Sequence, residues 1–98
     1  MVTILTTETF DAWFSQLKDT QARVRIQVRI DRAEEGNFGD CQPVGEGVSE
    51  MRIHHGPGYR VYLTRRGMEI VVLLAGGVAP LTTRTLLVSR SIGRGMAF

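Results

Sequence analysis

The stretch SEMRIHHGPGYRVYLTRRGMEIVVLLAGG, residues 49–77, decides the fold expected for this chain. It contains three β-prone runs, SEMRIHH, GYRVYLTRR and MEIVVLLAGG, with turn-forming residues between them. The GPG sequence at residues 56–58 predicts the first hairpin turn, and Arg66-Gly67 predicts a two-residue turn in the second. The apolar run at residues 70–74 is typical of a central strand covered on both faces. These residues predict an antiparallel meander.

The turn at residues 56–58 also predicts a register for the first hairpin. If His55 lies opposite Tyr59, alternation of side chains between the faces sorts the hairpin cleanly. One face carries four polar side chains, namely Arg52, His54, Arg60 and Tyr62. The other face carries apolar side chains, namely Met51, Ile53, Val61 and Leu63, joined across the second turn by Ile70, Val72 and Leu74. This register pairs His54 with Arg60 and packs the apolar face on helices.

The first part of the chain is expected to supply those helices. Residues 2–5 form a short β-prone segment, and Thr7 is placed to cap the helix that follows. Apolar residues then recur at helical spacing, namely Phe10, Trp13, Phe14 and Leu17. This spacing favours core packing for the aromatic side chains over stacking on nucleic-acid bases.

Residues 21–35 fit two different periods. The apolar residues Val24, Ile26, Val28 and Ile30 alternate with polar ones, as in a strand. Another set recurs at intervals of three or four, as in a helix that ends at Gly36, namely Ala22, Ile26, Ile30 and Ala33. Alternation favours a strand, but a length of about 15 residues is more usual for a helix. The residues alone leave this choice open.

The order of these elements predicts one α+β domain. Residues 36–47 are rich in turn formers and are expected to be a connection to the meander. The predicted architecture is therefore two N-terminal helices packed on a mainly antiparallel sheet of about four strands.

The composition is that of a globular chain. Its 98 residues suit one domain, and 43% hydrophobic with 22% charged residues argues against intrinsic disorder. The longest apolar run is far shorter than the roughly 20 residues that span a bilayer. The first residues lack the pattern of a secretory signal, and the single cysteine, Cys41, fits a reducing compartment as a bland, partly buried residue. We therefore expect a cytoplasmic protein without a membrane span.

The positive charge is carried almost entirely by arginine. Of 12 basic residues, 11 are arginine and only Lys18 is lysine, although the net charge is just +2. The planar guanidinium group suits phosphate and stacks on bases. Arginine enrichment also follows from GC-rich coding, so it is only a weak indication of a nucleic-acid partner.

The polar face of the first hairpin has the groups needed to cleave RNA. Arginines bind phosphate and stabilise the extra charge of a phosphorane-like transition state. Histidine transfers protons near neutral pH, and tyrosine hydrogen-bonds or stacks on a base. The alternative is that an exposed sheet face simply carries mixed polar residues. A metal site at His54 and His55 is disfavoured, because neighbours on a strand point in opposite directions and no third ligand is evident.

Several segments resemble the HigB-like addiction-module toxins of the RelE/ParE superfamily. They are ETFDAWFSQLKD, RIDRAEEGNFGDCQPVGEGVSEMRIHHGPGYRVYL and IVVLLAGG, and together they cover roughly residues 4–77. The resemblance implies a RelE/ParE-like fold in which residues 21–35 form the second of two helices. It implies a toxin of a type II toxin–antitoxin system, typically a ribosome-dependent mRNA endonuclease that needs no cofactor. The implied partners are mRNA on the ribosome and a helix-turn-helix antitoxin, through which the complex is expected to reach operator DNA.

The resemblance also assigns roles to residues. Arg52 and His54 match positions used for substrate phosphate and proton transfer, and Arg60 matches the arginine that stabilises the transition state. Tyr62 and Arg65 are expected to contact RNA. A ParE-type toxin that poisons gyrase, and an inactive remnant that only binds its antitoxin, are the alternatives.

The resemblance ends after the glycine pair at residues 76–77. Related toxins continue with a segment containing acidic residues and lysine and then a polar helix, whereas this chain continues VAPLTTRTLLVSRSIGRGMAF. We therefore separate a toxin domain, residues 1–77, from a divergent tail, residues 78–98. One hypothesis is a frameshift in the gene. The other is a genuine variant in which Arg84 replaces the missing lysine and contacts RNA.

Overall fold

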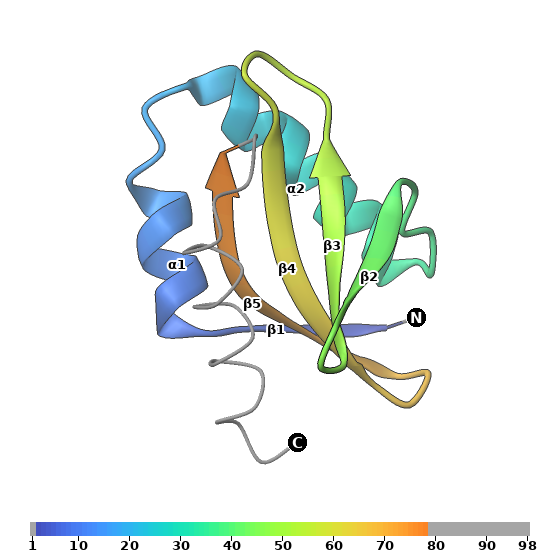
Figure 1. The fold of residues 1–98 in the computed structure, drawn as a ribbon. Coiled ribbons are helices and arrows are strands. Elements are labelled where there is room, and N and C mark those ends of the chain that lie inside the picture. Colours follow the sequence, from blue (N-terminus) through green and yellow to red (C-terminus); the bar gives the residue numbers. More distant parts are fainter. Residues whose placement is uncertain (1, 79–98) are drawn as a thin grey trace.

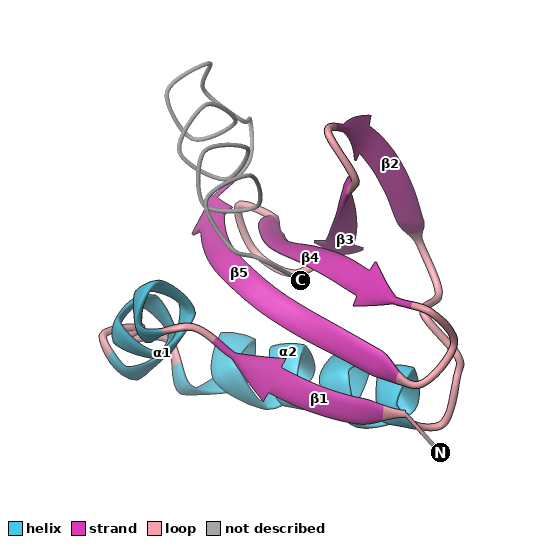
Figure 2. Ribbon diagram, turned by 90° about the horizontal axis from the view of Figure 1, so that it is seen from below, coloured by secondary structure: helices cyan, strands magenta, loops and turns pink. Residues whose placement is uncertain are grey.

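The computed structural model describes residues 2–78 of the chain (Figure 1). In chain order its elements are β1 (Thr3–Thr6), α1 (Glu8–Ser15), α2 (Thr20–Glu34), β2 (Cys41–Gly45), β3 (Val48–Ile53), β4 (Tyr59–Arg66) and β5 (Ile70–Val78). Figure 2 shows both helices on the same side of one sheet. The α+β class and the two N-terminal helices are confirmed. Neither described helix is long and apolar enough to cross a membrane. The expectations for the tail, including Arg84, lie outside the described residues.

The sheet has five strands, which corrects the expected number of about four, and it is mainly antiparallel, as expected, with one parallel pair. Its order is β1-β5-β4-β3-β2, with β1 parallel to β5 and every other pair antiparallel. The additional strand is β2, which lies in the segment expected to be only a connection. This strand was not predicted because it contains Pro43, and proline is tolerated in a strand only where no ladder hydrogen bond is needed. β2 is an edge strand that pairs with β3 alone, so its proline is acceptable there.

Helix α1 begins as expected and packs on β5. The Thr7 hydroxyl accepts a hydrogen bond from the backbone N–H of Phe10 at 3.0 Å and donates one to the carbonyl of Leu74 at 2.6 Å. Thr7 therefore caps the helix and fixes it to the sheet. A Cβ atom at Gly76 would lie 2.1 Å from Cε3 of Trp13, so only glycine lets Trp13 pack directly on the β5 backbone.

Residues 20–34 form a helix, as the family resemblance implied and the alternation did not. The carboxylate of Asp19 accepts a hydrogen bond from the backbone N–H of Ala22 at 3.1 Å and caps α2. The buried residues of α2 are those of the helical period, namely Ala22, Ile26, Ile30 and Ala33. Val24 and Val28 created the strand-like alternation, and both are exposed.

The register of the β3–β4 hairpin differs from the prediction by two residues. Arg52 lies opposite Arg60, Glu50 lies opposite Tyr62, and residues 54–58 form the connection. The predicted pairing of His54 with Arg60 is therefore wrong. Because a shift of two residues is a full period of a strand, Arg52, Arg60 and Tyr62 still share one face, as predicted.

The β4–β5 turn contains three residues instead of two. Arg66 lies opposite Ile70, which leaves residues 67–69 in the turn. Val71 and Leu73 therefore face the helices, whereas Ile70, Val72 and Leu74 pack with the cluster on the other face, so the prediction for these three residues is wrong. A register shift next to Tyr62 then leaves Leu74 without a cross-strand partner, and this bulge turns Gly76 towards Trp13.

Apolar residues are buried on both faces of the sheet. The larger cluster, which includes Phe10, Ile26 and Leu63, lies between the sheet and the helices. The smaller cluster, on the opposite face, contains Tyr62 and Leu74. The prediction of a β5 covered on both faces is consistent with its burial, since residues 71–75 are all buried.

Candidate functional site

Four polar side chains meet on the sheet face opposite the helices, and we call them the arginine cluster: Glu50 and Arg52 on β3, and Arg60 and Tyr62 on β4. Strand alternation places residues 50 and 52 on one face of β3, and the observed register sets them against Tyr62 and Arg60 respectively. The hairpin alone therefore assembles this cluster.

Glu50 holds the two arginines together. It is only 2% exposed. Nε of Arg52 donates a hydrogen bond to Oε1 of Glu50 at 2.8 Å, and Nε of Arg60 lies 3.5 Å from the same oxygen. The hydrogen bond to Glu50, and its negative charge, raise the pKa of Arg52, which keeps the guanidinium protonated. Sequence reasoning missed Glu50, although its position two residues before Arg52 on a strand placed both on one face.

The carboxylate uses the Nε edge of each guanidinium and so orients the rest of the group. The Arg52 side chain is 41% exposed, and its terminal nitrogens make no hydrogen bond to another residue within 2–78. The Arg60 side chain is 18% exposed, and its Nη1 donates to the carbonyl of Tyr59 at 3.2 Å. The exposed terminal nitrogens of Arg52 are thus available to an anion.

Two buried polar atoms of the cluster have no hydrogen-bond partner among the described residues. They are Nε of Arg60, which forms an ion pair with Glu50 at 3.5 Å but no hydrogen bond, and the hydroxyl of Tyr62. Burial, and then the charge of Glu50, raise the pKa of Tyr62, so its hydroxyl keeps its proton. Because Tyr62 is fully buried, its ring offers no exposed surface on which a base could stack.

His54 lies outside β3, in the connection after it. Its Nε2 is 2.7 Å from Oδ2 of Asp40, and this hydrogen bond lowers the pKa of the Asp40 carboxyl. Although His54 does not pair with Arg60 across the strands, both residues border a shallow depression of about 350 Å³ with residues 55–58. The connection therefore returns His54 to the neighbourhood of Arg60.

His55 and Tyr59 face away from the arginine cluster. Nε2 of His55 lies 3.4 Å from Oδ2 of Asp19, at the start of α2. Tyr59 is buried in the cluster of apolar residues beneath the helices. These contacts hold the two ends of the connection against the body of the protein.

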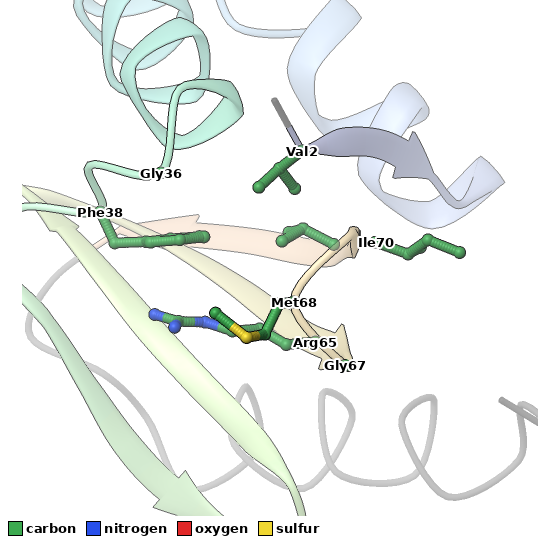
Figure 3. Close-up of a pocket in the computed structure, with 8 residues that line it drawn as sticks. Val2, Gly36, Phe38, Arg65, Gly67, Met68 and Ile70 are labelled. Atoms are coloured by element: carbon green, nitrogen blue, oxygen red, sulfur yellow. The ribbon is translucent and has the colours of Figure 1, made fainter.

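Arg65 lies apart from the arginine cluster, on the helix-facing side of β4. Its guanidinium carbon is 3.7 Å from the centroid of the Phe38 ring. Both side chains line a cavity of about 180 Å³. Figure 3 shows them with Val2, Met68 and Ile70, which also line it. The half-buried Cys41 lies close to Arg65, and burial raises the pKa of its thiol.

Arg29 of α2 supports the site from the other side of the sheet, and sequence reasoning missed it. Its Nη1 donates to the backbone carbonyl of Arg52, and its Nη2 donates to the carbonyls of Phe38 at 3.0 Å and Asp40 at 3.3 Å. One guanidinium group thus joins α2 to the backbone that carries Arg52 and to the segment that carries Asp40. Only the tertiary structure reveals this role, since Arg29 resembles its neighbouring arginines in the sequence.

Among the described residues, no three His, Cys, Asp or Glu side chains come together as a metal site. The arginine cluster and its surroundings offer two guanidinium groups that can bind an anion, a protonated phenol, and a nearby histidine oriented by a carboxylate.

The chain is similar to a bacterial protein whose sequence it matches over most of its length. A Haemophilus influenzae protein named "Uncharacterized protein" is 49% identical over 76 residues, which are 78% of this chain and 77% of that protein. The chain belongs to the family of that protein. No family model matches the chain. The name of this family member states no activity, so only the geometry of the arginine cluster and His54 indicates the chemistry of the site.

Proposed function

We propose that the chain is the toxin of a type II toxin–antitoxin system and cleaves mRNA on the ribosome. The observation that carries the proposal is the pair of arginines, Arg52 and Arg60, which both contact Glu50. His54 borders the same depression as Arg60. The resemblance of residues 4–77 to HigB-like toxins of the RelE/ParE superfamily supports the same activity, and the α+β architecture is compatible with it.

The two arginines bind the scissile phosphate in this proposal. Arg52 contacts a non-bridging oxygen through its exposed terminal nitrogens, and Arg60 stabilises the charge that builds on phosphorus in the transition state. Glu50 keeps both groups fixed before the RNA arrives, which reduces the reorganisation required during the reaction.

In this proposal His54 carries out one of the two proton transfers of the reaction. The ribose 2′-OH attacks the adjacent phosphorus, the bond to the 5′-oxygen breaks, and a 2′,3′-cyclic phosphate and a 5′-hydroxyl end form. One group must take the 2′-OH proton and another must give a proton to the leaving oxygen. His54, whose ring Asp40 orients, performs one of these transfers, and a water molecule performs the other. Tyr62 keeps its proton. Its hydroxyl is buried, so a hydrogen bond from it to the phosphate requires that RNA binding expose the hydroxyl.

Arg60→Ala tests the proposal. We expect expression of the chain without its antitoxin to produce codon-aligned mRNA cuts on translating ribosomes. Arg60→Ala should reduce their frequency by about 100-fold, the usual cost of removing one transition-state donor. The measurement is sequencing of mRNA 5′ ends, and Arg23→Ala, an arginine on α2 remote from the cluster, is the control.

Other outcomes identify the alternatives. DNA damage without mRNA cuts would support a ParE-like gyrase poison, and no growth effect would support a remnant that only binds its antitoxin. A neighbouring gene for a helix-turn-helix protein would support the toxin–antitoxin assignment without choosing the target. The coding DNA tests the frameshift hypothesis, which fails if no alternative frame restores the family's acidic-lysine segment and helix.

A further inference from the structure

Two valines on α2 form an apolar stripe that the fold does not use. Val24 and Val28 lie one helical turn apart and are 57% and 40% exposed. β-branched residues are also less favourable in a helix than unbranched ones. Their place on the surface therefore has no explanation in the packing or the helix propensity of the described chain.

The stripe runs through two neighbouring depressions. One, of about 360 Å³, is lined by Thr20, Gln21, Val24 and Arg25. The other, of about 340 Å³, is lined by Arg25, Val28, Arg29, Arg32, Ile53 and His54. Because Arg25 borders both, they form one surface along α2, which we call the α2 groove. From residue 20 to residue 32 a helix rises about 18 Å, enough to contact three turns of another helix.

The α2 groove is positively charged. Arg29 is engaged with backbone carbonyls, but the side chains of Arg25 and Arg32 have no hydrogen-bond or ion-pair partner within residues 2–78. Neither depression has an aspartate or glutamate in its lining. An occupant of the groove would therefore meet two available guanidinium groups on either side of Val28.

We propose that the α2 groove binds an acidic amphipathic helix of a partner protein. Two apolar side chains one turn apart on that helix cover Val24 and Val28, and its carboxylates pair with Arg25 and Arg32. RNA fits this surface less well, because the two valines offer exposed apolar surface and the lining contains no phenylalanine, tyrosine or tryptophan ring on which bases stack. The groove borders the proposed reaction site at His54, but Val24, Val28, Arg25 and Arg32 have no part in that reaction, so helix binding is tested independently of RNA cleavage.

The test uses the full chain and synthetic probes. The main probe is a fluorescein-labelled peptide of about 15 residues, long enough to form helix, with leucines four residues apart and glutamates beside them. The matched probes are the same peptide with lysine in place of glutamate and a labelled single-stranded RNA. Binding is measured by fluorescence anisotropy, with circular dichroism of each variant to check folding.

We expect the acidic peptide to bind, and Arg25→Glu to weaken it by about tenfold while improving binding of the lysine peptide. That gain cannot come from misfolding. Val28→Ser should also weaken the acidic peptide. Arg23→Glu makes the same charge change on α2, beside Phe14, and should alter affinity by less than about twofold, since screened surface charges contribute little.

Three outcomes would overturn the proposal. The first is no binding of the acidic peptide to the wild-type chain. The second is equal weakening by Arg23→Glu and Arg25→Glu, which would indicate general charge attraction. The third is tighter binding of the RNA that is lost in Arg25→Glu, which would assign the α2 groove to nucleic acid.

Discussion

At the scale of single residues, Glu50 supports both stability and the proposed chemistry. A carboxylate that is 2% exposed must be paired, and Arg52 and Arg60 supply that pairing. The pairing also positions the guanidinium groups before any anion arrives. Glu50 therefore compensates the charge of the two arginines in the β3–β4 pair and also sets the geometry of the candidate site.

Glu50→Gln should destabilise the protein. The substitution keeps the side-chain size but removes the charge that compensates two arginines. We expect the free energy of unfolding to fall by about 1–3 kcal/mol, as when buried polar groups lose a partner. Urea denaturation measures the change, with the exposed turn residue Glu69→Gln as control. Equal stability of the two variants would contradict the role assigned to Glu50.

Tyr62 should make the protein sensitive to alkali. In the unfolded chain the phenol loses its proton near its ordinary pKa of 10.0, whereas burial raises the pKa of the folded state. Above pH 10 the unfolded state therefore binds fewer protons than the folded state, and stability falls as pH rises. We expect this decrease in urea denaturation of the wild-type protein and a smaller one in Tyr62→Phe.

Tyr62→Phe should cost little stability at neutral pH, because the hydroxyl it removes has no hydrogen-bond partner among the described residues. If its alkaline stability profile matches the wild-type profile, Tyr62 is not the group that titrates. A large loss of stability at neutral pH would instead indicate a hydrogen bond to the hydroxyl.

At the scale of elements, the contact between α1 and β5 depends on Gly76. Gly76→Ala would place Cβ 2.1 Å from Trp13, well inside contact distance. We expect the substitution to lower the free energy of unfolding by about 1–3 kcal/mol, as for other overpacked cores. Trp13→Leu should recover part of this loss, so a double-mutant cycle by thermal unfolding tests the contact. Additive effects would show that the two residues are independent.

The start of α2 should confer acid sensitivity. Hydrogen bonding to the Ala22 backbone N–H and to His55 lowers the pKa of Asp19 in the folded state. The stabilisation is therefore present above the unfolded pKa of 3.8 and is lost as pH falls through the lower folded value. Asp19→Ala should reduce stability at neutral pH and flatten this acid response. Asp19→Asn should keep more stability, because asparagine also caps helices. Unfolding midpoints from pH 2 to 7 test this, and an unchanged acid response in Asp19→Ala would contradict it.

At the scale of the whole molecule, Arg29 joins the helix layer to the sheet. Arg29→Met should keep the apolar stem but leave the carbonyls of Phe38, Asp40 and Arg52 without their donor. We expect faster amide hydrogen exchange at Arg52, whose N–H donates to the carbonyl of Asp40, with little change in the β4–β5 pair. Uniformly faster exchange would instead indicate global destabilisation.

Much of the architecture was predictable because it depends on local period. Strand alternation correctly placed Arg52, Arg60 and Tyr62 on one face, and the helical spacing after Thr7 predicted α1. Turn length was less accessible, since a GPG sequence does not say how many flanking residues leave the ladder. The β3–β4 connection is longer than predicted, so His54 lies outside β3. The β4–β5 turn is one residue longer than predicted, so different β5 side chains face the helices.

The remaining features depend on neighbours that are distant in sequence. The alternation in residues 24–30 gave no sign that Val24 and Val28 would be exposed, because exposure depends on which side of α2 meets the sheet. Glu50 and Arg29 have ordinary surface residue types, and only the assembled sheet shows one buried between arginines and the other bonded to three carbonyls. The roles of Glu50 and Arg29 depend on tertiary contacts, which no local sequence pattern predicts.

The parallel pairing of β1 with β5 has a consequence for biosynthesis. Thr3 lies opposite Ile70, so the first strand to be translated waits for the last described strand before it gains a partner. Such a long sequence separation delays closure of the sheet until nearly the whole domain has been made. During that interval β1 and the apolar side of α1 remain uncovered on the nascent chain. Premature termination before β5 removes the strand that lies between β1 and β4, so it yields an aggregation-prone fragment and not a smaller folded protein.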